Sequence, residues 1–142
     1  MMEGGARFFL GAAMAQDGGD AEAALAVMEE GAQLWWGTGA RNYRAYGEML
    51  QAQAHVRLDH LDRAQAMLAA AHDGIAATGE RWVEPELWRV EGEWLRATDG
   101  EAASLAKLRR SLEQAQAQGA QTWVQRAQAS LRQRAGTAAT MP

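Results

Sequence analysis

The sequence predicts an all-α fold, arranged as a solenoid of helical hairpins with three units of about forty residues and a terminal helix. The first observation behind this prediction is composition. The 142 residues include only two prolines and are rich in Ala, Leu, Gln, Glu and Arg, side chains that lose little rotamer freedom in a helix. Apolar residues make up 48% and charged residues 23%, as in globular proteins. We expect one folded domain over residues 1–135 and a flexible tail over residues 136–142.

The second observation is that similar residues recur at an interval of forty. Gly39, Gly79 and Gly119 each follow an apolar-periodic stretch, where a glycine favours the end of a helix. The same interval relates small residues to small ones and large residues to large ones. The small residues should let the two helices of each unit approach closely, and the large residue should fill the space between them. The sets are Ala12, Ala52 and Gly92; Ala24, Ala64 and Ser104; Met28, Leu68 and Leu108; and Gly31, Ala71 and Ser111.

Turn signals divide each unit into two helices. Residues 17–20, 58–60 and 98–100 interrupt the helical pattern midway through the units. Residues 7–15 also imitate a secretory signal, because Arg7 precedes an apolar run, but the run is short for a signal core and is better explained as part of the first repeat. Helices are therefore predicted at residues 5–16, 21–37, 41–57, 61–78, 85–97, 101–118 and 121–134.

This arrangement of small and large residues resembles the tetratricopeptide repeat, and the resemblance implies that the helical-hairpin solenoid is right-handed. Trp88 and Phe8 match the aromatic residue near the start of the first helix of that repeat, whereas Glu48 departs from it. The period is also longer than the usual repeat of about thirty-four residues, so we expect slightly longer helices.

Residues 79–95 and 111–120 are similar to the C-terminal repeat region of large bacterial regulators, which carry a nucleotide cyclase or a LuxR-type DNA-binding head, then an ATPase module, then repeats. The resemblance implies that the chain is a detached C-terminal segment or a small stand-alone relative, with a scaffold role in signalling or transcription regulation. No glycine-rich phosphate loop is present, and the only lysine is Lys107. Cyclase and ATPase activities are therefore not expected in this chain.

Charge and side-chain chemistry disfavour several other functions. The net charge is −4, and the sequence shows no cluster of basic residues of the kind that binds nucleic acids. The absence of cysteine fits a reducing cytoplasm, and no stretch approaches the ~20 apolar residues of a membrane span. We expect no metal, no cofactor and no enzymatic activity, because neither group of candidate residues has a suitable spacing. These groups are His55, His60 and His72, which do not converge, and the acidic cluster Glu84, Glu86, Glu91 and Glu93, which suits a helix start and helical ion pairs with Arg89 or Arg96.

The expected partner is a protein or peptide bound on the face formed by the first helix of each unit. Tetratricopeptide groove positions, carried onto this sequence, predict the groove residues Phe9, Ala13, Tyr46, Met49, Gln53, Arg57, Glu86, Arg89, Glu93 and Arg96. An equally open alternative is that these residues form a solvated helix face. The first helix should also leave Phe8, Phe9, Leu10 and Met14 uncovered, which predicts truncation or self-association.

The six tryptophans allow a second functional class. A small-ligand sensor would line its pocket with Tyr46, Trp88 and Trp94. The alternative is packing, with Trp82 and Trp123 wedged between units and with one of Trp35 and Trp36 more buried than the other.

Overall fold

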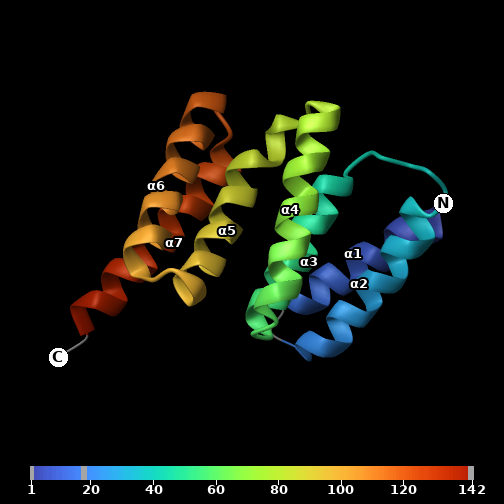
Figure 1. Cartoon of the computed structure of the whole chain (residues 1–142), viewed down its shortest axis with the longest axis horizontal. Helices are drawn as coiled ribbons and strands as arrows, with labels where there is room; N and C mark the ends of the chain where they lie inside the picture. The colour runs from blue at the N-terminus through green and yellow to red at the C-terminus, as the bar shows by residue number, and fades with distance from the viewer. Residues whose placement is uncertain (1, 17–18, 141–142) are drawn as a thin grey trace. The chain divides into compact units, whose positions relative to one another are not determined.

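The computed structural model describes residues 2–16 and 19–140, and these residues form seven α-helices, one 3₁₀ helix and no strand (Figure 1). The all-α prediction is confirmed. The helices are α1 (Met2–Gln16), α2 (Ala21–Trp36), α3 (Arg44–Arg57), α4 (Leu61–Thr78), η1 (Arg81–Val83), α5 (Glu84–Thr98), α6 (Glu101–Gln118) and α7 (Gln121–Thr140).

The helix boundaries differ from the predicted ones at a few ends. α3 begins at Arg44 and not at residue 41, because Tyr43 has a left-handed backbone with φ of 59° that an α-helix cannot contain. α7 continues through Gly136 to Thr140, beyond its predicted end at residue 134. The flexibility predicted for residues 136–142 stays a prediction. Residues 17 and 18 of the first predicted turn lie outside the described residues.

The chain divides into two compact units, Met1–Ala77 and Thr78–Pro142. In the first unit, α1 and α2 form a hairpin, and α3 packs against both. In the second unit, α6 packs against both α5 and α7, and α5 also contacts α7. The prediction of a single domain is not decided by this division.

The α1–α2 hairpin is held close by glycines. A Cβ atom on Gly11 would lie 2.7 Å from the backbone nitrogen of Met28, and one on Gly31 would overlap the backbone of Phe8. Only glycine, which has no side chain, allows the backbones of α1 and α2 to come this close together. The Phe8 ring next to this crossing is fully buried.

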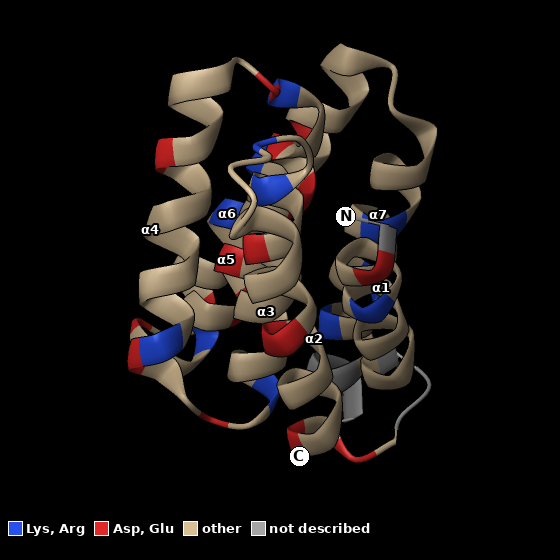
Figure 2. Cartoon of the chain, turned by 90° about the vertical axis from the view of Figure 1, so that its right-hand side faces the viewer, with Lys and Arg blue, Asp and Glu red and all other residues tan. Residues whose placement is uncertain are grey.

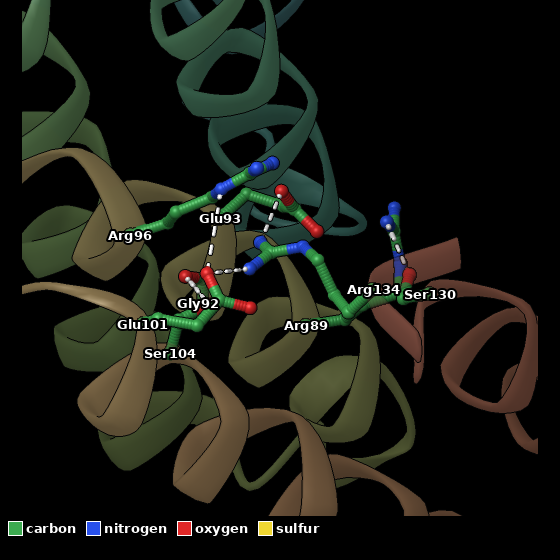
Figure 3. A network of polar contacts seen from close by, with 8 residues as sticks. All are labelled: Arg89, Gly92, Glu93, Arg96, Glu101, Ser104, Ser130 and Arg134. Atoms are coloured by element: carbon green, nitrogen blue, oxygen red, sulfur yellow. Dashed lines mark hydrogen bonds and ion pairs between the residues drawn. The ribbon is translucent and has the colours of Figure 1, made fainter. Parts of the chain in front are cut away.

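The α5–α6 hairpin uses two serines for the same approach. Ser104 donates a hydrogen bond from Oγ to the carbonyl oxygen of Gly92 at 2.7 Å (Figure 3), and Ser111 donates one to the carbonyl oxygen of Pro85 at 2.7 Å. Both serines are buried, and each hydroxyl hydrogen has an acceptor on the facing helix.

The forty-residue pattern therefore corresponds to core positions. All twelve residues of the four sets related by this interval are buried. The three glycines of the repeat lie just beyond helix ends with positive φ values of 91°, 74° and 66°, as the sequence predicts for Gly39, Gly79 and Gly119.

Candidate interaction site

Four aromatic side chains gather where α1, the end of α2 and the start of α3 meet. The ring centroids of Phe9 and Tyr46 are 6.4 Å apart, those of Phe9 and Trp35 are 5.7 Å apart, and those of Trp35 and Tyr43 are 6.4 Å apart. Phe9 is 42% exposed and Tyr43 is 48% exposed, whereas Trp35 and Tyr46 are half-buried. We call Phe9, Trp35, Tyr43 and Tyr46 the aromatic patch.

A buried layer fixes the position of this patch. Trp36 stacks on Trp35 with a centroid separation of 5.0 Å and an interplanar angle of 13°, and it meets Phe8 edge-on at 5.2 Å. The indole nitrogen of Trp36 donates a hydrogen bond to the carbonyl oxygen of Asn42 at 3.3 Å. One of the two tryptophans is more buried than the other, as predicted, and it is Trp36.

This arrangement suits contact with another protein. Tyrosine and tryptophan offer large rigid surfaces at a low cost in side-chain entropy, and they are enriched at protein interfaces. Leu10 and Leu34 of the same hairpin are 58% and 45% exposed. Of the apolar N-terminal residues predicted to be uncovered, Phe9 and Leu10 are exposed, Met14 is half-buried and Phe8 is fully buried.

The predicted groove residues of the first unit separate into two groups. Phe9 and Tyr46 come together in the aromatic patch. Met49 is 1% exposed and belongs to the core, because its side chain lies on the buried side of α3. Arg57 donates a hydrogen bond from Nη1 to the carbonyl oxygen of Ala15 at 3.0 Å, which ties α3 to α1. Gln53 is half-buried and Ala13 is exposed.

Two predicted groove residues of the second unit, Glu86 and Arg89, are buried and form an ion pair. Glu86 also pairs with Arg126 of α7, and Arg89 lies 3.4 Å from the hydroxyl group of Ser130. These two side chains therefore connect α5 to α7 and are not open to a partner. This burial could not be predicted from the sequence, because no local pattern indicates which residues of α5 and α7 meet.

The other two, Glu93 and Arg96, belong to a polar network that is shown in Figure 3. Arg134 of α7 bonds to Glu93 at 2.8 Å and to Glu101 at 2.8 Å, and Arg96 lies 3.5 Å from Glu101. The Arg134 side chain is only 4% exposed. The network therefore fastens α7 to α5 and α6, and half of the Arg96 side chain faces solvent.

The acidic cluster consists of carboxylates that are each close to a cation. Besides Glu86 and Glu93, Glu91 lies 2.8 Å from Lys107, and Glu84 lies 3.9 Å from Arg81. This agrees with the structural interpretation of the cluster.

Two of the three histidines lie close together. His55 and His60 have ring centroids 5.7 Å apart, and His55 lies 3.9 Å from Glu29. Burial lowers the pKa of His55, which favours its neutral form, and the nearby Glu29 opposes this shift. Among the residues that the structure describes, no group of three or more His, Asp or Glu side chains could hold a metal ion.

The remaining tryptophans lie in the second unit. Trp82 and Trp123 stack with centroids 6.4 Å apart, and the indole nitrogen of Trp123 donates a hydrogen bond to the carbonyl oxygen of Trp82 at 2.7 Å. The guanidinium group of Arg110 lies 4.8 Å from the ring centroid of Trp88. The alternative small-ligand pocket was predicted to be lined by Tyr46, Trp88 and Trp94. Trp88 and Trp94 belong to this unit, whereas Tyr46 belongs to the first. The pocket stays a prediction.

Basic and acidic residues are interspersed along the helices seen in Figure 2. None of the described helices combines the length and the apolar character needed to cross a membrane. The chain matches no protein family model, no curated protein and no solved structure.

Proposed function

We propose that this chain is a tetratricopeptide-like repeat module that binds a protein or peptide through the aromatic patch. The burial of matching residues at a forty-residue interval supports the repeat, because each unit uses the same positions for its core. Close approach through small residues in both the α1–α2 and α5–α6 hairpins supports the same relationship.

The polar outer side of α7 supports a solenoid as well. A solenoid needs a polar outer face on its terminal unit. The exposed side chains of α7 include the polar residues Gln121, Thr122, Gln125, Arg132 and Gln133, as expected of a terminal cap. The α1–α2 hairpin instead exposes Leu10 and Leu34.

The observation that carries the binding function is the meeting of Phe9 and Tyr46. These residues come from the first helices of consecutive predicted units, and their rings are 6.4 Å apart beside two further aromatic side chains. Neighbouring first helices line the binding face of a helical repeat array. A short peptide with apolar side chains would bury the exposed parts of these rings.

Selection from a random peptide display library tests this function. Peptides enriched on the full chain should bind at least tenfold more weakly to Phe9→Ala and to Tyr46→Ala, and should bind Trp82→Ala normally. Trp82 is a suitable control because it is 40% exposed and lies in the second unit. Circular dichroism would verify that all variants remain folded. Equal binding to the patch variants, or no enrichment at all, would reject the aromatic patch as the binding site.

The proposal includes a cellular role for this repeat module. The resemblance of residues 79–95 and 111–120 to the repeats of bacterial regulators supports a cytoplasmic role in signalling or transcription regulation. The genomic sequence upstream tests this role, because an ATPase module in the same reading frame is expected. An unrelated upstream gene would favour a stand-alone scaffold.

Self-association through the N-terminal hairpin is the alternative way to cover Leu10 and Leu34. Sedimentation of the full chain should then show a dimer, and Leu10→Gln combined with Leu34→Gln should convert it to a monomer. A wild-type chain that stays monomeric at high concentration would refute this part of the proposal.

A further inference from the structure

The first unit contains an open hollow of about 410 Å³ on the side where α2, α3 and α4 meet. Gln33 and Trp36 of α2, Glu48 and Gln51 of α3 and Met67 of α4 line it, together with Arg44 at the start of α3. Its volume lies within the range of pockets that bind small ligands or single side chains. Glu48 and Arg44 are the charged residues among those that line it.

The repeat pattern explains this hollow. In the second forty-residue repeat, Glu48 occupies the position that Phe8 has in the first repeat and Trp88 in the third. In the second unit, the ring of Trp88 lies under Arg110 and Lys107, and the residue that corresponds to Lys107 is Met67, which lines the hollow. A carboxylate side chain is much smaller than an indole ring, so space is left beside it.

The Glu48 carboxylate is incompletely satisfied. Glu48 is 8% exposed, and its Oε1 atom accepts a hydrogen bond from Nε of Arg44 at 2.9 Å. Its Oε2 atom is buried and has no hydrogen-bond partner in the described chain. Burial raises the pKa of Glu48 and the charge of Asp73 adds to this, although Arg44 opposes the shift. A buried acceptor without a partner is costly, so a further donor would be favourable here.

We propose that the hollow beside Glu48 binds an alkylammonium group, supplied either by a lysine side chain of a bound protein or by a free amine. The ammonium group has three donors and a positive charge for the carboxylate of Glu48. The alkyl stem would lie against Trp36 and Met67, and the side-chain oxygens of Gln33 and Gln51 offer further acceptors. The Arg44 side chain beside this carboxylate is 56% exposed. None of the four residues of the aromatic patch lines this hollow.

Nuclear magnetic resonance titration of the full chain tests this site. The free-amine probe is 1,5-diaminopentane, and the peptide probe is an acetylated, amidated pentapeptide with lysine between glycines. Each has a neutral counterpart, namely 1-pentanol and the same peptide with norleucine in place of lysine. We expect saturable shifts at Gln33, Glu48 and Gln51 with at least one amine and no saturation with its neutral counterpart. The amine that binds more tightly identifies the source of the group.

Two matched variants separate the charge of Glu48 from the shape of the hollow. Glu48→Gln removes the charge with little change in shape, and it should weaken amine binding at least tenfold. Glu29→Gln is the control, because Glu29 is a half-exposed carboxylate of the same unit that does not line the hollow. Binding that persists in Glu48→Gln, saturable binding of the neutral probes, or no saturable shift with either amine would overturn the proposal.

Discussion

Replacing Gly11 with alanine should destabilise the chain, although alanine is the better helix former. A Cβ atom on Gly11 would lie 2.7 Å from the backbone nitrogen of Met28 and 2.8 Å from the carbonyl oxygen of Ala24. Both are backbone atoms of α2, so they cannot turn aside as a flexible side chain could. The α1–α2 hairpin would have to open, which weakens its contacts along the interface.

The magnitude follows from two opposing effects. Overpacking of this kind typically costs about 1–3 kcal/mol, and backbone on the opposing side places Gly11 toward the upper end of this range. Removing a glycine from a helix returns about 1 kcal/mol. The free energy of unfolding should therefore fall by about 2 kcal/mol.

Urea unfolding followed by circular dichroism measures this change, with Gly74→Ala as the matched control. A Cβ atom on Gly74 would lie 3.6 Å from the Cβ of Ala45, an ordinary contact. Gly74 lies in α4 of the same unit, so its replacement should raise stability by up to about 1 kcal/mol. If Gly11→Ala is as stable as Gly74→Ala, the helices are not held at the close approach described above.

Three further changes test other parts of the structure. Arg134→Met should lower the free energy of unfolding by about 1–2 kcal/mol, because two partly exposed carboxylates lose the buried guanidinium group with which they pair. In urea unfolding, replacement of the exposed Arg132 with Met should change stability by less than about 0.5 kcal/mol. Equal effects of the two substitutions would argue against the network. Gly119→Ala should cost about 1 kcal/mol through its φ of 66° alone, since a Cβ there meets nothing within 4 Å; unchanged thermal stability would contradict that backbone conformation. The pKa of His55 is lower in the folded chain than its ordinary value of 6.5, so its contribution to stability is present above pH 6.5 and is lost as the pH falls toward the folded pKa. Urea midpoints between pH 8 and pH 5 should therefore fall less steeply in His55→Gln than in the wild type, and parallel pH profiles would exclude this role.

Much of the helical framework could be predicted because its signals are local. Gly39 and Gly79 mark helix ends by a conformation that each glycine adopts within its own turn. The periodic burial of Met28 and Leu68 follows from spacing along a single helix. The start of α3 was missed because the left-handed conformation of Tyr43 has no clear signal in its residue type.

The candidate site could be predicted only in part. Phe9 and Tyr46 were identified by their repeat positions, whereas Trp35 and Tyr43 join them through the way in which α2 ends and α3 begins. The hollow beside Glu48 was missed, although the departure of that residue from the aromatic pattern was a usable signal.

The sequence by itself determined the all-helical class, the helix boundaries to within a few residues at most ends and the positions that form the core of each unit, because these depend on propensity and periodicity along the chain. Tertiary structure alone decided that Glu86 and Arg89 are buried against α7, and that Arg134 joins three helices. Burial and ion pairing of this kind depend on which distant segments come together, and the order of residues within one helix does not specify that.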